Sequence, residues 1–543
     1  MTDSRNYLIH YFILLVVCLF AFFVNNQVIP ADLMESRNLA TAQEMIHTDN
    51  YLMPTMNGEP RLEKPPLPTW IAAGVELLIP GNLIVQRYMA GISATIMAFF
   101  LYFLVIRLTK NRNLGLISSL VLVSCFNIIL MGRTATWDIY CHSFMLGAIY
   151  FLVLGLEEKG RQWKWFILTG IFLGLSFLSK GPVSFYALLL PFLISYIIMF
   201  RPSAKGKGLP ILVMLLVCLI ISTWWPVYAR LSHPELSVAV ASKESSSWLG
   251  HNVRPLYYYW QFPAEAGIWA VFWVTSLCWF YWKRKIENRR MYIFSIVWTF
   301  AAFVLLSVIP EKKTRYLLPM LIPGAINIAF YIYYCATAIM SRKEKNIFRF
   351  NMSLIILILL ALPVALYIMF MKESMMGLPM YIAISVLSIA LAVFIALAVF
   401  NKHRVDVYKA FTGVILTMIV VEGLCLIPIG RMFINDDRHS IKMLRDIATV
   451  QNMPFYHDQD EYVRMELVYE ANQIIRPLDI SDSIDIQSKL PFVFVSGLPI
   501  DSLFSDKNVT IEVIDTFDNN WQKKTSRKYN KDLVKEVAII RKK

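Results

Sequence analysis

The sequence predicts an all-α membrane protein of about thirteen transmembrane helices, followed by a small α/β domain outside the membrane. Three observations lead to this fold class. The 543 residues are 57% hydrophobic and 17% charged, with a mean hydropathy of +0.53, which is far more apolar than a soluble protein of this length. Apolar runs of about 18 to 25 residues, long enough to cross a bilayer, recur from Tyr7 to Pro428. After Pro428 the chain becomes polar and shows strand patterns.

The apolar runs place the predicted spans, and clusters of Lys and Arg occupy alternate loops. The spans lie near residues 7–25, 84–106, 113–132, 137–156, 163–179, 183–200, 209–230, 264–282, 291–309, 316–338, 352–371, 378–400 and 409–428. The basic loops begin at Arg107, Lys159, Arg201, Lys283, Arg342 and Lys402. Basic loops stay in the cytoplasm, so we expect a cytoplasmic N-terminus and a periplasmic C-terminal domain. The net charge of +14 therefore reflects topology, and we expect no nucleic-acid partner.

The first run, residues 7–25, is too long for the core of a signal peptide and lacks a small-x-small cleavage site before Asn25. We expect a retained first helix in the plasma (inner) membrane. All seven cysteines lie in or beside apolar runs. This placement argues against a disulfide framework or a cysteine metal site.

The polar tail predicts a folded periplasmic domain, so we divide the chain into a transmembrane domain, residues 1–430, and a soluble α/β domain, residues 431–543. Residues 440–451 have helical periodicity. Strand patterns occur at residues 491–496, 509–514 and 533–540.

The segment between the first two spans, residues 28–81, is too long for a simple connection and too amphipathic for a disordered one. It contains Ala31 to Arg37, a helical stretch to about Met45, and the Pro-containing stretch from Tyr51 to Trp70. We expect two juxtamembrane helices lying on the periplasmic membrane surface.

Several short motifs follow one another in a specific order. They are Glu35-Ser-Arg37, Asn57-Gly-Glu, Leu62-Glu-Lys-Pro-Pro-Leu67, Arg133 to Asp138, Leu178-Ser-Lys-Gly-Pro182, His251-Asn-Val-Arg-Pro255 and Lys312-Lys-Thr-Arg-Tyr-Leu-Leu-Pro319. In these motifs the sequence resembles the bacterial lipid A aminoarabinose transferase family of the protein O-mannosyltransferase-like GT-C superfamily. The resemblance covers the transmembrane part well and the tail weakly. It implies a GT-C fold and a sugar donor carried on polyprenyl phosphate, of the undecaprenyl type in a bacterium.

Moving a sugar from a lipid phosphate requires cations, because negative charge develops on the departing phosphate. Basic residues that break the positive-inside rule on the predicted outer side are Arg37, Arg61, Lys64, Arg133, Lys180, Arg254, Lys312, Lys313 and Arg315. Those that we predict to bind the lipid phosphate are Lys64, Arg37, Lys180, Arg254, Lys312 and Arg315. The alternative is that these long side chains reach for membrane headgroups.

A hydroxyl acceptor also needs a carboxylate to take its proton in an inverting attack on the sugar. The resembled family places one Asp just after the first span and another on the second periplasmic loop, and Asp138 matches the second. Met34 stands at the first position, so the role falls to Glu35 or Asp32. Alternatively, Asp32 is an N-cap with Glu35 at the third helical position, as in a capping box. Asp138 lies beside Trp137 at the head of an apolar span, where an acid is costly without a partner or a task.

The resemblance also implies a divalent metal, zinc or a similar ion, with Glu63 and His251 as ligands. Zinc sites usually show three or four ligands, so two distant ones do not make a metal site by themselves. Hydrogen bonds that structure the site are the alternative. His142, four residues after Asp138, is expected to be a satisfied residue at the membrane interface.

The predicted function is a membrane glycosyltransferase that moves a monosaccharide, hexosyl or pentosyl, from polyprenyl phosphate to lipid A, another glycan or a protein on the periplasmic face. The sequence has no Gly-rich nucleotide-binding loop, which favours a lipid-linked donor. One alternative is a transporter or flippase of an anionic polyprenyl lipid, which should carry its charges near mid-span. Others are a polysaccharide polymerase or ligase, which takes a larger glycan, and an assembly protein that works through its tail.

Overall fold

The computed structural model describes residues 2–160, 162–250, 252–372, 376–401, 404–431 and 435–543, which fold into two compact units. The unit that we call the membrane unit consists of Met1–Asn26, Glu63–Leu67 and Arg87–Pro428. The unit that we call the sheet unit consists of Gln27–Leu62, Pro68–Gln86 and Ile429–Lys543. Its last segment begins close to the predicted boundary, but it also contains two segments that the sequence assigns to the transmembrane domain, 27–62 and 68–86.

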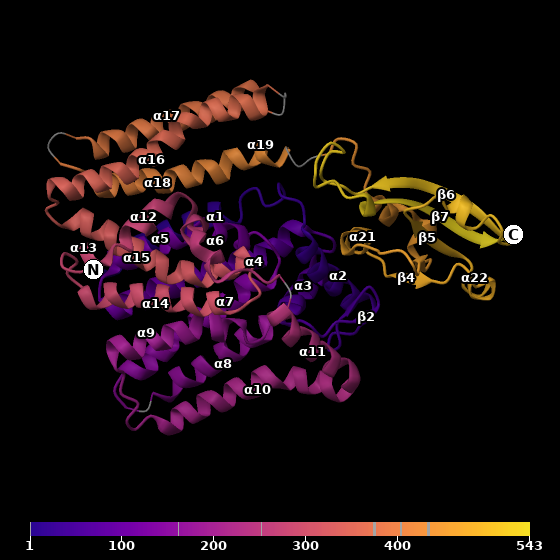
Figure 1. The fold of residues 1–543 in the computed structure, drawn as a ribbon, viewed down its shortest axis with the longest axis horizontal. Coiled ribbons are helices and arrows are strands. Elements are labelled where there is room, and N and C mark those ends of the chain that lie inside the picture. Colours follow the sequence, from indigo (N-terminus) through magenta and orange to yellow (C-terminus); the bar gives the residue numbers. More distant parts are fainter. Residues whose placement is uncertain (1, 161, 251, 373–375, 402–403, 432–434) are drawn as a thin grey trace. The chain divides into compact units, whose positions relative to one another are not determined.

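The membrane unit is built from helices that lie side by side (Figure 1). In chain order, with η marking 3₁₀ and π helices, they are α1 (Thr2–Phe22), α4 (Leu83–Thr109), α5 (Arg112–Val123), α6 (Phe126–Gly132), α7 (Trp137–Glu157), α8 (Trp163–Lys180), η1 (Phe185–Leu189), α9 (Leu190–Phe200), α10 (Gly208–Ser232), α11 (Pro234–Gly250), η2 (Leu256–Trp269), α12 (Ala270–Ser276), α13 (Trp279–Trp282), α14 (Arg289–Val308), η3 (Thr314–Leu317), α15 (Leu318–Thr337), α16 (Arg342–Leu366), η4 (Tyr367–Met371), α17 (Leu378–Val399), α18 (Val407–Val420), η5 (Val421–Cys425) and α19 (Leu426–Arg431). Helices satisfy their own backbone hydrogen bonds, which is what a chain needs inside hydrocarbon.

Most predicted spans correspond to single helices. By length and composition, eight helices in the described residues are long and apolar enough to cross a membrane, or nine if the bent pair α5 and α6 forms one span. Three more predicted spans fall on α1, on α8 and on η1 with α9. The prediction of one continuous helix at 264–282 is wrong. Gly267, with φ 60° and ψ −120°, interrupts that stretch, which divides among η2, α12 and α13.

Arg133 holds the end of α1 in place. Its guanidinium donates to the carbonyl oxygens of Phe20, Ala21 and Val24, each at 2.7 Å, where the last turn of a helix leaves carbonyls unpaired. Its Nη2 also lies 2.9 Å from Glu422 Oε2, and both side chains are buried. Arg133 was predicted among the outer cations, and the structure gives it a structural task.

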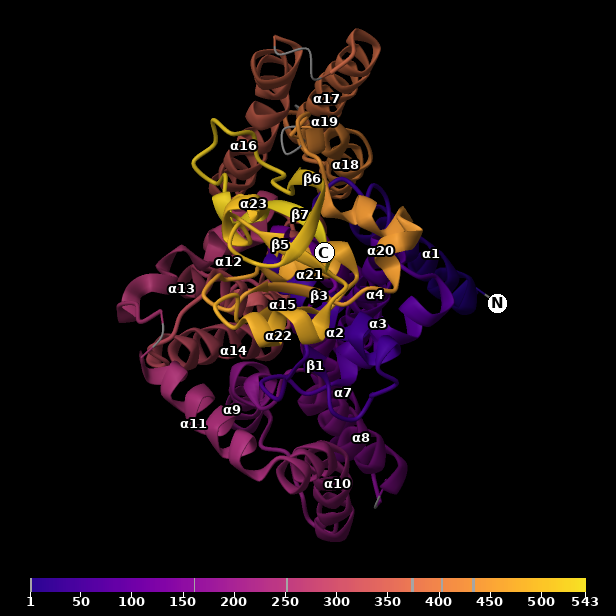
Figure 2. The same cartoon turned by 90° about the vertical axis from the view of Figure 1, so that its right-hand side faces the viewer.

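The sheet unit contains one mixed sheet and short helices. Its elements are α2 (Leu33–His47), β1 (Thr55–Met56), β2 (Glu59–Pro60), α3 (Leu67–Leu78), η6 (Ile441–Asp446), α20 (Ala448–Gln451), β3 (Phe455–Asp458), α21 (Met465–Ala471), β4 (Ile475–Leu478), α22 (Ser483–Lys489), β5 (Phe492–Ser496), α23 (Ile500–Leu503), β6 (Val509–Asp518), η7 (Lys531–Leu533) and β7 (Val534–Lys542). The strand order is β4-β3-β5-β7-β6. The sheet is drawn in orange to yellow in Figure 2. Strand β3 pairs in parallel with β4 and β5, whereas β7 is antiparallel to β5 and β6.

The predicted α/β tail is confirmed, with differences in detail. The three predicted strands are β5, β6 and β7, and α2 and α3 are the two helices predicted between the first spans. The predicted helix at 440–451 divides into η6 and α20. Strands β3 and β4 escaped prediction because each has only four residues, too few for a clear alternation. The fully buried β5 supplies the core through Phe492 and Phe494.

The Asn57-Gly-Glu motif forms the turn of the β1–β2 hairpin and ties it to the large sheet. Asn57 and Gly58 have φ of 55° and 83°, the left-handed pair that a tight two-residue hairpin requires. The carboxylate of Glu44 accepts from the backbone N–H groups of Asn57, at 2.5 Å, and Gly58, at 3.0 Å. The Asn57 side chain donates to the Ile475 carbonyl at 2.7 Å and accepts from the Ile475 N–H at 2.8 Å. Strand β4 lies at the edge of the sheet, and the Asn57 side-chain amide pairs with it on the side that has no neighbouring strand.

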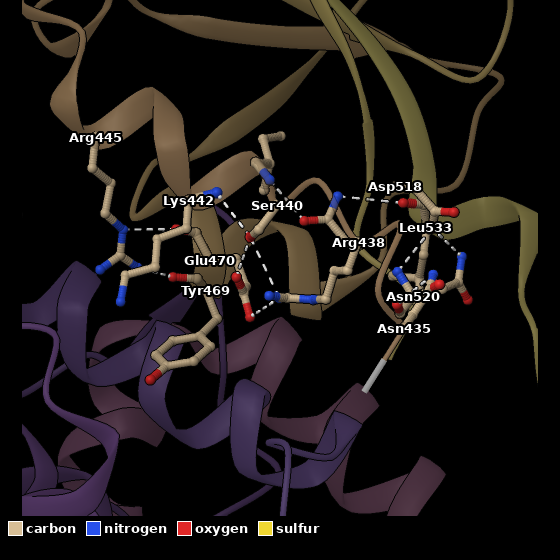
Figure 3. Close-up of polar contacts among 12 residues, drawn as sticks. Asn435, Arg438, Ser440, Lys442, Arg445, Tyr469, Glu470, Asp518, Asn520 and Leu533 are labelled. Carbon is tan, nitrogen blue, oxygen red and sulfur yellow. Dashed lines mark hydrogen bonds and ion pairs between the residues drawn. The ribbon is translucent and has the colours of Figure 1, made fainter. Parts of the chain in front are cut away.

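The segment from residue 435 to residue 446 is bound to the rest of the sheet unit by polar contacts (Figure 3). Arg438 forms a 2.8 Å ion pair with Glu470 at the end of α21. The backbone N–H of His439 donates to the Asp518 carbonyl at the end of β6, at 3.1 Å. The start of the tail is therefore held against both α21 and β6.

Candidate functional site

Three segment ends meet at a buried ion pair in the membrane unit. Asp138 is the second residue of α7, and Lys180 is the last residue of α8. The Lys180 ammonium forms an ion pair with the Asp138 carboxylate, and the two side chains are only 8% and 3% exposed. The Lys180 Nζ also lies 5.3 Å from the centre of the Tyr316 ring in η3. Asp138, which the sequence left in need of a partner or a task, has its partner.

Arg315 adds a second cation beside this pair. It precedes Tyr316 in η3, and its charge acts on both Asp138 and Lys180. Its Nε is buried and has no hydrogen-bond partner within the described part of the chain. An unused charged donor next to a buried ion pair suits an anion that arrives from outside.

Two loops pair beside the site and keep Lys312 occupied. Val253 and Glu311 form an antiparallel bridge, and the backbone N–H of Arg254 donates to the Pro310 carbonyl at 3.1 Å. The Lys312 ammonium donates to the carbonyls of Arg254, at 3.2 Å, and Ile309, at 2.6 Å. Burial lowers the pKa of Lys312. We assign Lys312 to holding the loops together. Arg254 itself is exposed, with its guanidinium 5.9 Å from the Tyr258 ring.

A small cavity of about 50 Å³ opens beside the ion pair. Its lining residues are Asp138, His142, Val183, Tyr186, Ala187, Tyr259, Leu306, Ile309, Glu311 and Tyr316. Glu311, which sequence reasoning missed, accepts from Lys313 Nζ at 2.6 Å and from the Tyr316 hydroxyl at 3.4 Å. Its position directly before the Lys312–Pro319 motif was the only available signal. Three tyrosines, two carboxylates and a histidine supply a few polar groups in a wall whose exposed surface is mostly apolar.

His142 lies one helical turn after Asp138 on α7 and lines the same cavity. Its side chain is 1% exposed, and its Nδ1 has no hydrogen-bond partner among the described residues. The prediction that His142 is a satisfied residue is therefore wrong. Sequence patterns show that a histidine faces inward, but not whether a hydrogen-bonding group faces it.

Lys64 and Glu63 lie in the loop before α3, and both are partly exposed. The Lys64 Nζ is 3.4 Å from Glu244 Oε1 on α11. His251, the second predicted metal ligand, lies outside the described residues. Within those residues, no three His, Cys, Asp or Glu side chains come together in a way that could hold a metal. The metal therefore stays a prediction that rests on Glu63 and His251.

Asp32, Glu35 and Arg37 belong to the sheet unit. Asp32 Oδ1 accepts from the Glu35 N–H at 2.7 Å, so its predicted N-cap position is confirmed. Glu35 is fully buried on α2, which packs on α21. Burial, with a smaller contribution from the charge of Glu35, raises the pKa of Tyr469 on α21. The Nε of Arg37 is buried without a hydrogen-bond partner among the described residues.

Known proteins share this architecture. A family model described as dolichyl-phosphate-mannose-protein mannosyltransferase matches residues 63–226. The undecaprenyl phosphate-alpha-4-amino-4-deoxy-L-arabinose arabinosyl transferase of Yersinia enterocolitica is 23% identical over 339 residues, 57% of either chain. An uncharacterized protein of Aquifex aeolicus is 26% identical over 341 residues, 62% of this chain and 65% of that protein. The crystal structure of ArnT from Cupriavidus metallidurans bound to undecaprenyl phosphate has a TM-score of 0.69 at 15% identity, over 99% of this chain and 98% of that one.

The chain shares the fold of the ArnT structure, and its sequence is similar to those of undecaprenyl phosphate-linked aminoarabinose transferases. The predicted fold class is confirmed, including the small sheet domain after the last apolar helix. The matched residues 63–226 contain Lys64, Asp138 and Lys180. The chain spans 57% and 65% of the lengths of the two curated relatives.

Proposed function

We propose that this multi-pass membrane protein is a glycosyltransferase that takes a monosaccharide from a polyprenyl-phosphate carrier, undecaprenyl phosphate in a bacterial cell. The acceptor is lipid A, another glycan or a protein on the periplasmic face of the plasma membrane, with the N-terminus in the cytoplasm. The observation that carries the proposal is the unused guanidinium donor of Arg315 beside the buried Lys180–Asp138 pair, where Asp138 and Tyr316 line a cavity. The names of the arabinosyl transferase relatives support a lipid-phosphate donor.

Arg315 is the best placed phosphate ligand in the membrane unit, because the neighbouring ammonium groups already have partners. Lys312 donates to two carbonyls, Lys313 to Glu311, and Lys180 to Asp138. A planar guanidinium also fits phosphate oxygens through two parallel hydrogen bonds. Lys180 would be the second cation to face the phosphate, with Asp138 as the group that holds its ammonium in place.

An apolar groove offers room for the polyprenyl chain. It has a volume of about 580 Å³ and is lined by Ile194, Trp279, Ile293, Ile296, Val297, Phe300, Ala301, Val304 and Leu305. Residues from Ile293 to Leu305 repeat every three or four positions, so they form one face of α14, about 18 Å long. Tyr186 lines the cavity, and its hydroxyl donates to the carbonyl of the groove residue Leu305 at 2.6 Å. The groove and the cavity therefore lie on neighbouring parts of α14, at Leu305 and Leu306.

In the proposed reaction, an acceptor oxygen attacks the anomeric carbon of the sugar. The bond from that carbon to the phosphate oxygen breaks, and its electron pair stays on the phosphate, where Arg315 and Lys180 stabilise the charge. The proton of the acceptor passes to a carboxylate, for which Glu35 and Asp32 remain the proposed candidates. Asp138 is better suited to positioning Lys180, since its carboxylate is engaged by the ammonium.

The test is transfer of radiolabelled sugar by the purified protein in liposomes that contain polyprenyl-phosphate sugars and candidate acceptors. Arg315→Gln removes the proposed phosphate ligand and should lower transfer at least tenfold, since hydrogen bonds to charged groups are worth about 1.5–3 kcal/mol. Lys409→Gln removes an equal charge at an exposed position and serves as the control. Normal transfer by Arg315→Gln would refute the assignment. Lipid translocation by the wild type, without any sugar transfer, would favour a flippase.

A further inference from the structure

His142 is the exception among the polar side chains that line the cavity, because the others already have partners. Asp138 pairs with Lys180, and Glu311 accepts from Lys313. The hydroxyls of Tyr186, Tyr259 and Tyr316 donate to the Leu305 carbonyl, the Lys313 carbonyl and the Glu311 carboxylate. Among the described residues that line the cavity, only His142 has a buried side-chain atom, Nδ1, without a hydrogen-bond partner.

A buried nitrogen without a partner is costly, by about 1–3 kcal/mol, so such groups in folded proteins usually have a task. A metal does not explain this one, since the described residues contain no cluster of three metal-ligating side chains. A phosphate does not explain it either, because the charged side chains of Arg315 and Lys180 lie nearby and bind an anion more strongly than an imidazole. What remains is a neutral polar group that enters the cavity with the ligand.

We propose that His142 binds the sugar ring of the lipid-linked donor, through a hydrogen bond between its Nδ1 and a ring hydroxyl or amino group. This inference rests on the proposed function, and it names the residue that recognises the sugar as distinct from those that bind the phosphate. A hydroxyl or amino group fits either imidazole tautomer, because it can both donate and accept. His142 is placed one helical turn from Asp138 on α7, so the sugar would lie beside the group that holds Lys180 in place.

The experiment measures binding of two lipids to the full-length protein in detergent. One is bare undecaprenyl phosphate. The other is undecaprenyl phosphate that carries a monosaccharide. This lipid is the one that binds the wild type most tightly in a panel that carries 4-amino-4-deoxy-arabinose, arabinose, mannose or glucose. His142→Leu removes both ring nitrogens at similar volume, and His142→Gln keeps a hydrogen-bonding group. Met145→Leu, a buried volume-conserving change on the same helix, controls for repacking.

We expect His142→Leu to bind bare undecaprenyl phosphate like the wild type and the glycosylated lipid about three- to tenfold more weakly, the loss of one neutral hydrogen bond. His142→Gln should recover part of this loss, and Met145→Leu should change neither affinity. Equal weakening for both lipids, or no weakening for the glycosylated one, would overturn the assignment of His142. A wild type that binds neither lipid would instead overturn the proposed function.

Discussion

Replacing either member of the Asp138–Lys180 pair should destabilise the membrane unit strongly. Both side chains are almost fully buried, so a single substitution leaves one charge without a partner in a medium of low polarity. Such changes cost about 3–5 kcal/mol, in line with an attraction of about 4 kcal/mol between charges at 4 Å and an effective dielectric constant of 20. Removing both charges together costs far less, because no unpaired charge remains.

Arg315 makes the two single substitutions unequal. Its positive charge acts on both members of the pair. Asp138→Asn leaves the Lys180 ammonium facing a like charge, whereas Lys180→Met leaves the Asp138 carboxylate facing an opposite one. We therefore expect Asp138→Asn to be the more damaging change, and the double variant Asp138→Asn/Lys180→Met to be the most stable of the three.

Thermal unfolding followed by a thiol-reactive fluorescent dye suits this measurement. Cys18, Cys125, Cys141, Cys335 and Cys425 are buried free thiols, and all lie in the membrane unit, so the dye reports when that unit opens. The double-mutant cycle should show a coupling energy of about 3 kcal/mol. A double variant no more stable than the sum of the single effects would refute the coupling. Equal losses from the two single variants would refute the influence of Arg315.

Three further predictions concern parts of the molecule away from the cavity. Asn57→Ala removes two hydrogen bonds to Ile475 and should lower the stability of the sheet unit by about 1–3 kcal/mol, measured as faster hydrogen exchange in β4. Unchanged exchange would show that these two hydrogen bonds do not stabilise β4. Arg133→Met leaves the end of α1 uncapped and should cost more than about 3 kcal/mol in the thiol assay; a loss below 1 kcal/mol would refute the capping. Burial lowers the pKa of His457 below 6.5, so the unfolded chain binds its proton first as the pH falls. Stability of the sheet unit should therefore be complete above pH 6.5 and decline below it, with a flatter pH profile in His457→Gln; an identical profile would rule out His457 as the cause.

Part of the candidate site was accessible from the sequence. The motif order nominated Asp138, Lys180 and Arg315, and the structure brings these three together. Glu311 and Tyr186 of the cavity wall were missed, because acidic and aromatic residues near helix ends have many roles. Lys312 and Arg133 were nominated as cations for an anionic ligand, but backbone carbonyls occupy them. Charge and position along the chain do not reveal which partner a long side chain finds.

Features with a local physical cause could be predicted from the sequence alone. Span lengths follow from bilayer thickness, and the Asp32 cap follows from a bond between residues three apart, at 2.7 Å. Pairs between residues far apart in the chain could be identified only from the folded structure. Lys180 lies 42 residues from Asp138, and Asn57 lies 418 residues from Ile475. Hydropathy and periodicity report how much of a residue is buried, but the identity of its partner depends on which elements pack together.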